Sequence, residues 1–112
     1  MRTIQINLGL NNNPYSAEQV IGMFARSEKY RLMAYTIEDM TYEGHVEPTF
    51  VAMFEVMTSE CITDTVRTWS ILFQQECIAL STDTFETLVY ADRDSNKPYT
   101  FDKSMFRYLK IN

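Results

Sequence analysis

The chain contains little glycine and little proline, three of each among 112 residues. This scarcity excludes collagen-like repeats and the composition of a flexible linker. The 46% hydrophobic and 13% aromatic residues are typical of a folded globular protein. A chain of this length fits one core and needs neither disulfides nor metal to fold. We therefore predict a single domain over residues 1–98, followed by an amphipathic basic tail over residues 99–112 that packs on the domain or on a partner.

Long apolar runs are missing as well. No run approaches the roughly 20 residues that cross a bilayer, and the N-terminal MRTIQINLGL lacks the apolar region and cleavage site of a secretory signal. The two cysteines, Cys61 and Cys77, do not have CxxC spacing. Unpaired cysteines are typical of reducing compartments, where they pack as small hydrophobic side chains. These absences predict a cytoplasmic protein that does not enter a membrane.

Motifs for catalysis or metal binding are also absent from the sequence. His45 is the only histidine, and it lies between Glu43 and Glu47 in a predicted turn without a second histidine or cysteine nearby. The sequence supports no Ser-His-Asp arrangement, no zinc-deaminase signature and no glycine-rich dinucleotide fingerprint. The stretch DRDSNKPYTFDK begins like a calcium loop, but Lys97 and Lys103 replace the required glycine and glutamate. We predict no catalytic residue, no cofactor and no metal.

Positive charge is scarce in most of the chain. Residues 1–92 carry five basic and thirteen acidic side chains, a net charge of about −8, whereas residues 93–112 carry five basic and two acidic ones, about +3. A nucleic-acid groove needs clustered lysine and arginine, so the acidic body argues against a nucleic-acid partner. The basic tail either folds back onto the acidic surface or engages a separate partner.

The loop GLNNNPYSAEQ lies between a predicted strand and a predicted helix, where phosphate-binding loops also occur. A phosphate loop uses several glycine N–H groups and a basic side chain. This loop has one glycine, a proline and no basic residue, and Glu18 occupies the favourable field at the helix N-terminus. Ser16 and Gln19 have the spacing of a capping box. The loop is therefore predicted to be a turn with a helix cap.

Periodicity predicts the remaining elements. Apolar and polar residues alternate over residues 3–10, which is typical of a strand covered on one side only. We expect a helix from residue 17 that ends near residues 27–29, a helix of about sixteen residues from 58 or 59, and a short helix from about 102. Further strands are expected at 30–40, 49–57, 77–80 and 85–91. The order predicts an α+β domain with a ferredoxin-like βαββαβ antiparallel sheet, both helices on one face, plus an extra strand and the C-terminal helix.

Such a fold leaves the second sheet face open for a partner. We expect this face to carry Thr3, Gln5 and Asn7 of the first strand together with large side chains of the middle hairpin. Apolar residues of the tail are expected to need burial against the domain or a partner. The candidate partner-binding residues are Gln5, Asn7, Tyr35, Glu38, Asp39, Glu43, Met53, Phe101, Met105 and Phe106.

The stretch FQQECIALSTD, residues 73–83, resembles a segment of small uncharacterised proteins of tailed bacteriophages. In that pattern a helix ends in Gln-(Glu or Asp)-Cys-Ile-Ala and leads into a short strand. The resemblance covers about ten residues, and more loosely residues 49–90. It implies a phage accessory protein that acts in the cytosol of a bacterium. It implies no activity.

Three functions follow from these observations. The first is a non-enzymatic interaction protein that binds and occludes a host defence or regulatory protein, with the carboxylates steering the encounter. The second is a small-molecule binding or sequestering protein that holds its ligand between the sheet faces of a homodimer. The third is a virion component, or an enzyme whose carboxylates, such as Glu38, Asp39 and Glu55, gather only in the fold.

Overall fold

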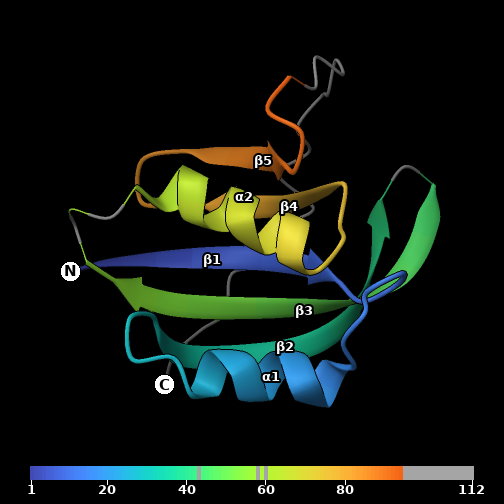
Figure 1. The fold of residues 1–112 in the computed structure, drawn as a ribbon, viewed down its shortest axis with the longest axis horizontal. Coiled ribbons are helices and arrows are strands. Elements are labelled where there is room, and N and C mark those ends of the chain that lie inside the picture. The colour runs from blue at the N-terminus through green and yellow to red at the C-terminus, as the bar shows by residue number, and fades with distance from the viewer. Residues whose placement is uncertain (43, 58, 60, 95–112) are drawn as a thin grey trace.

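The computed structural model describes residues 1–42, 44–57, 59 and 61–94 (Figure 1). In chain order its elements are β1 (Arg2–Gly9), α1 (Ala17–Ala25), β2 (Arg31–Tyr42), β3 (His45–Val56), α2 (Ile62–Leu72), β4 (Cys77–Ser81) and β5 (Glu86–Tyr90). Every helix and strand predicted before residue 92 is present. The predicted tail and C-terminal helix, with Phe101, Met105 and Phe106, lie outside the described residues, as does Glu43.

All five strands form one antiparallel sheet in the order β2-β3-β1-β4-β5. β1 is the central strand, and it pairs with β3 from Arg2 opposite Val56 to Gly9 opposite Thr49. On its other side β1 pairs with β4. The α+β class and the extra strand after β4 are confirmed.

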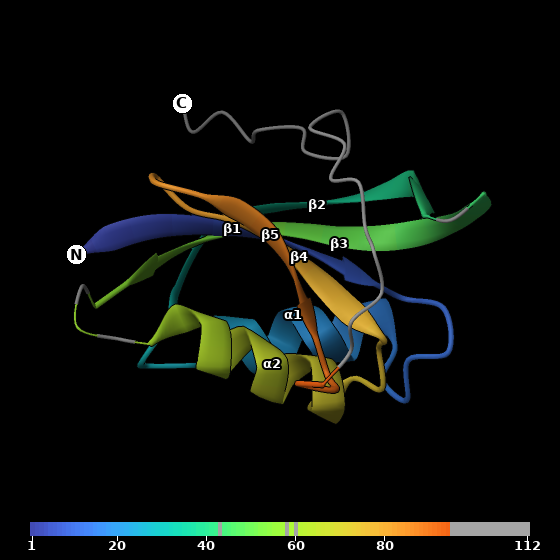
Figure 2. The ribbon, with the colours of Figure 1, turned by 90° about the horizontal axis from the view of Figure 1, so that it is seen from above.

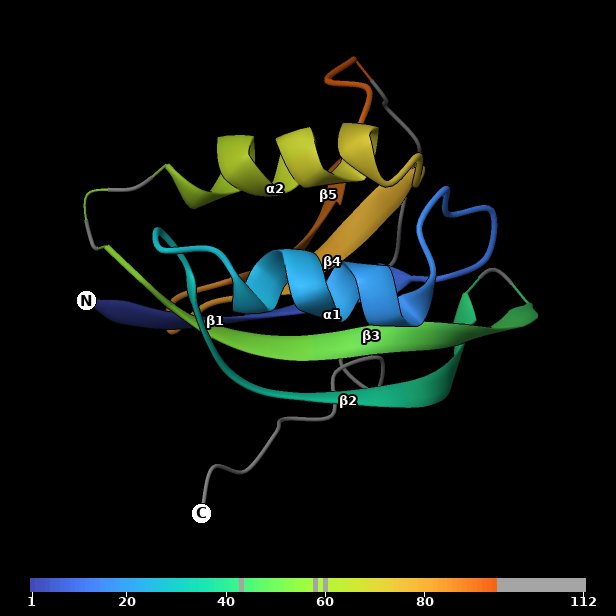
Figure 3. The same cartoon turned by 60° about the horizontal axis from the view of Figure 1, so that its bottom comes forward.

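Both helices cover the same face of the sheet (Figure 2). α1 packs near β2, and α2 packs over β4 and β5 (Figure 3). Phe24 of α1 lies at the centre of an aromatic cluster, with ring centroids 5.0 Å from both Phe54 and Trp69 and 5.8 Å from Phe73. Aromatic pairs at such distances each contribute about 0.5–1.5 kcal/mol beyond the area they bury. Trp69 is a core residue, as its helix stripe predicts.

The capping box at the start of α1 is confirmed. The Ser16 hydroxyl accepts a hydrogen bond from the Gln19 N–H at 3.2 Å, and the Gln19 side chain accepts one from the Ser16 N–H at 2.9 Å. In the preceding loop, the Asn13 carboxamide oxygen accepts a hydrogen bond from the Tyr15 N–H at 2.9 Å. These local bonds form because serine and asparagine side chains satisfy backbone donors that the helix leaves unpaired.

Two predictions about the face without helices are wrong. Gln5 and Asn7 lie on this face, but they are only 3% and 8% exposed, so β1 is covered on both sides. Tyr35 lies on the opposite face, because its register partner Ala52 belongs to the core and its ring is 5.7 Å from that of Phe50. The alternation of residue types along a strand shows which of its faces is polar. Whether that face is exposed depends on where the strand lies in the sheet.

Candidate functional site

The hairpin of β2 and β3 extends past the rest of the sheet. Pairing between β1 and β3 ends at Gly9 opposite Thr49, whereas β2 and β3 stay paired as far as Tyr42 opposite His45. We call this two-stranded extension, residues 39–48, the ribbon. The turn uses Gly44 with φ +79°, a backbone conformation that suits glycine. Two-stranded segments twist more strongly than wide sheets, and the ribbon turns away from the direction of β3 in Figure 1.

Sequence patterns predict the two strands but not the ribbon, because Pro48 and the turn at Gly44 place the expected strand ends at residues 40 and 49. Proline lacks an N–H and is tolerated where a strand has a free edge. At Pro48, β3 has passed the end of its pairing with β1, and the Pro48 carbonyl accepts a hydrogen bond from the Leu10 N–H at 2.9 Å. The hairpin therefore continues through the proline.

The ribbon folds across the sheet face that has no helices. The Cys77 thiol on β4 donates a hydrogen bond to the Tyr42 hydroxyl on β2, with Sγ and the oxygen 3.4 Å apart. In a flat sheet of this order, β2 and β4 would lie three strand spacings apart, about 14 Å. The contact is possible only because the end of the hairpin crosses over β3 and β1 toward β4.

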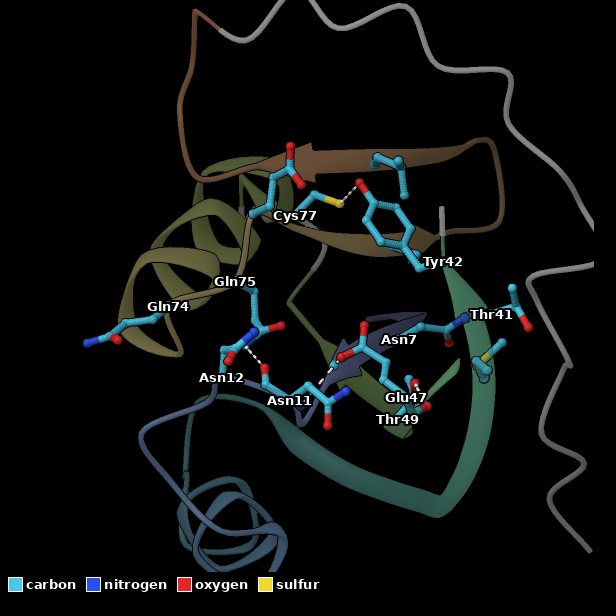
Figure 4. Close-up of a pocket in the computed structure, with 15 residues that line it drawn as sticks. Asn7, Asn11, Asn12, Thr41, Tyr42, Glu47, Thr49, Gln74, Gln75 and Cys77 are labelled. Atoms are coloured by element: carbon cyan, nitrogen blue, oxygen red, sulfur yellow. Dashed lines mark hydrogen bonds between the residues drawn. The ribbon is translucent and has the colours of Figure 1, made fainter. Parts of the chain in front are cut away.

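Beneath the ribbon lies a cavity of about 200 Å³ (Figure 4). Asn7 of β1, Thr49 of β3 and Ala79 of β4 form its floor, and all three side chains are buried. Figure 4 shows Tyr42 and Cys77 at one end of the cavity. The cavity therefore depends on strands from across the sheet and on the bend of the ribbon.

The wall opposite the ribbon is rich in carboxamides. Asn11 and Asn12 come from the loop after β1, and Gln74 and Gln75 come from the turn between α2 and β4. The Gln75 Nε2 donates to the Asn11 carbonyl at 3.1 Å and to the Phe73 carbonyl at 3.0 Å. The bond to Asn11 joins two loops that are more than sixty residues apart in sequence, so the wall is assembled by tertiary contacts.

Left-handed backbone conformations mark both loops of this wall. Asn12 has φ 57° and Gln74 has φ 52°, and they are the non-glycine residues with positive φ in the described part of the chain. Gln74 ends α2 in a Schellman motif, with the Gln74 N–H bonded to Ile71 and the Gln75 N–H bonded to Ser70. Left-handed glutamine is strained by about 1 kcal/mol, and strain of this kind clusters at functional sites.

Gly9 lets two polar side chains approach the backbone of β1. A Cβ at Gly9 would lie 2.7 and 2.8 Å from the carboxylate oxygens of Glu47 and 2.8 Å from Gln75 Oε1. Such distances are closer than a Cβ contact allows. A residue with a side chain at this position would therefore displace Glu47 and Gln75 from the cavity wall.

The charge of the lining has one sign. Glu47 and Glu76 contribute carboxylates, and none of the described lining residues is lysine, arginine or histidine. Within the part of the chain that the structure describes, no group of three metal-binding side chains gathers, and no helix is long and apolar enough to span a membrane. The site is a cavity of mixed polarity, in which amide and hydroxyl side chains supply most of the polar groups and the charged groups of the described lining are carboxylates.

The structure separates the predicted partner-binding residues. Asn7 lines the cavity, whereas Gln5 and Met53 pair with each other elsewhere on the same sheet face. Glu38 and Asp39 are consecutive on β2, so their side chains point to opposite faces.

The three carboxylates considered for an enzyme do not meet. Glu55 pairs with Arg31 at 3.5 Å, and along β3 it is six residues, or about 20 Å, from Thr49, the register partner of Glu38. This separation is too large for two carboxylates to act on one bond.

Sequence reasoning identified the polar stretches of the site but did not combine them. Asn11, Asn12 and Asn13 are interpreted as turn formers, and Gln74 and Gln75 as the end of a helix. Each interpretation is correct locally. The usable signal was that amide-rich stretches follow β1 and precede β4, two strands expected to be neighbours in this topology.

Comparison with protein-family models, with curated proteins and with solved structures found no match to this chain.

Proposed function

We propose that this chain is a binding protein for a small polar molecule, which occupies the cavity beneath the ribbon. The cavity itself carries this proposal. Its volume of about 200 Å³ equals the liquid volume of roughly six or seven waters. Sites for drug-sized ligands measure about 300–1,000 Å³, so the expected ligand is smaller. Five carboxamides from three separate segments line the space and can each donate and accept hydrogen bonds.

The domain is best assigned to the ferredoxin-like plait with β5 as an added edge strand. The order β2-β3-β1-β4 and the position of both helices on one face support this assignment. In our proposal the ligand lies on the face without helices, within one chain. A second subunit is not required to complete the cavity.

Native mass spectrometry tests the proposal. We expect the protein to retain a small-mass adduct after incubation with a desalted metabolite extract. Ala79→Leu fills the cavity floor and should abolish the adduct, whereas Ala25→Leu, at an exposed position of α1, should keep it. Absence of any adduct, or an adduct that persists in a folded Ala79→Leu protein, contradicts the proposal.

A second candidate function is that of an interaction protein that binds and occludes a host protein. The supporting observation is β2, a 12-residue edge strand with Tyr35 48% and Ile37 40% exposed. Long edge strands with apolar side chains are templates for pairing with another chain. Asp39, exposed on the same strand, adds negative charge for steering.

Lysine substitution tests this second function, because lysine protects strand edges from pairing. A partner captured from bacterial lysate and identified should bind the purified protein but not the Tyr35→Lys/Ile37→Lys variant. Val46→Lys, on the exposed ribbon, is the matched control. Equal binding by both variants would show that the partner does not bind at the edge of β2.

A further inference from the structure

We propose, resting on the function proposed above, that the ligand carries a positively charged nitrogen group, ammonium or guanidinium, and that the Glu47 carboxylate binds it. The observation is a convergence of acceptor oxygens in the cavity wall. Both oxygens of Glu47 and the Oε1 of Gln75 pack against the Gly9 backbone, each 2.7–2.8 Å from the position that a Cβ would occupy there. These three oxygens only accept hydrogen bonds and lie close together, so a ligand rich in N–H donors matches them from the cavity side.

The orientation of the Gln75 amide is set by its hydrogen bonds. Its Nε2 donates to the carbonyl groups of Asn11 and Phe73, at 3.1 and 3.0 Å. Carbonyl oxygens only accept hydrogen bonds, so the amide nitrogen must face them and Oε1 must face Gly9. The amide therefore presents an acceptor, not a donor, beside Glu47.

Glu47 has unused hydrogen-bonding capacity. A carboxylate accepts about four hydrogen bonds, and Glu47 Oε2 accepts one long bond, from the Asn11 N–H at 3.4 Å. No lysine, arginine or histidine among the described residues forms an ion pair with it. The hydroxyl of Thr49, on the cavity floor, donates to the Glu47 backbone carbonyl at 3.1 Å and not to the Glu47 carboxylate.

The charge of the lining determines which ligands fit. The Glu47 carboxylate repels phosphates and carboxylates, and no described residue of the lining is basic. A cation forms charge-assisted hydrogen bonds with Glu47, which are shorter and roughly twice as strong as neutral ones. The carboxamides then bind the uncharged part of the molecule. An inorganic metal ion fits less well, since no cluster of three metal-binding side chains occurs in the described residues.

NMR titration with matched probes tests the charge requirement. Methylguanidinium and N-methylurea have nearly the same shape, but only the first is charged. In ¹H–¹⁵N spectra of the full chain, the side-chain amide signals of Asn11 and Gln75 report on the cavity. We expect methylguanidinium to bind at least about tenfold more tightly than N-methylurea. Glu47→Gln should abolish this preference, and Glu28→Gln, at an exposed site outside the cavity, should retain it.

The outcomes separate this proposal from the general one. If N-methylurea binds in the cavity as tightly as methylguanidinium, or if Glu47→Gln retains the preference, the charge requirement is wrong while small-molecule binding stands. If neither probe shifts the cavity signals at millimolar concentration, the assignment to an organic cation is overturned, whereas binding of another small molecule is decided by the mass-spectrometry test above. A response to calcium chloride without one to methylguanidinium also overturns the assignment to an organic cation.

Discussion

The Tyr42 hydroxyl and the Cys77 thiol lie 3.4 Å apart, although β3 and β1 separate their strands in the sheet. This hydrogen bond joins the end of the ribbon to the first residue of β4 and closes one end of the cavity. Within the ribbon, β2 and β3 pair only with each other. A contact such as this one therefore helps to keep the ribbon over the sheet.

Removing the hydroxyl should loosen the ribbon. We expect Tyr42→Phe to reduce the free energy of unfolding by about 0.5–1 kcal/mol, because one partner of a partly buried hydrogen bond is lost. Amide hydrogen exchange should accelerate mainly in residues 39–48. Tyr35→Phe, at a half-exposed position of β2, is the control and should change neither quantity. Unchanged exchange in Tyr42→Phe would show that other contacts hold the ribbon.

Gly9 should matter for binding more than for folding. The new Cβ of Gly9→Ala meets the flexible ends of Glu47 and Gln75, so these side chains move and the backbone stays. The free energy of unfolding should change by less than about 1 kcal/mol, while binding of methylguanidinium weakens by about tenfold or more.

The control for Gly9→Ala is Gly22→Ala in α1, where the nearest atom to a new Cβ is 3.4 Å away, on Arg26. That change should raise the free energy of unfolding by up to about 1 kcal/mol, because alanine is a better helix former than glycine. Ligand binding should stay the same. Equal binding by Gly9→Ala and the unmodified protein would contradict the role given to Glu47 and Gln75.

Gln74→Gly should stabilise the domain. Gln74 has φ 52° at the end of α2, and glycine adopts this conformation without the strain that a Cβ causes. We expect a gain of about 0.5–1 kcal/mol by chemical denaturation. Gln75→Gly, one residue later and outside the left-handed region, should destabilise instead. A loss of stability in Gln74→Gly would mean that the glutamine side chain makes a contact worth more than the backbone strain.

Ser16→Ala should destabilise α1. The substitution removes the acceptor for the Gln19 N–H and disrupts the reciprocal capping box. The expected loss is about 1 kcal/mol, measured by thermal or chemical unfolding. Thr68→Ala is the control, because its exposed hydroxyl bonds only to a carbonyl one turn earlier in α2. Similar losses of stability in both variants would show that the capping box contributes no more than the Thr68 hydroxyl does.

Local features of the chain were predictable because neighbouring residues determine them. Alternation in β1 and the stripe that includes Trp69 in α2 follow from side-chain spacing along a strand and a helix. Ser16 and Gln19 meet because a helical turn brings them together. The β2–β3 and β4–β5 pairings were predictable because short connections favour antiparallel neighbours.

The sequence by itself determined the helices, the strands, the cap of α1 and the hairpin turn at Gly44. Tertiary structure alone decided that β1 is covered on both faces, that the ribbon folds over the sheet, and that Glu47 and Gln75 meet above Gly9. The physical reason is the distance in sequence between the residues that interact. Hydrogen bonds of caps and turns join residues a few positions apart, whereas the cavity depends on where the β1–β3 pairing ends and on contacts such as Gln75 with Asn11, which no local pattern encodes.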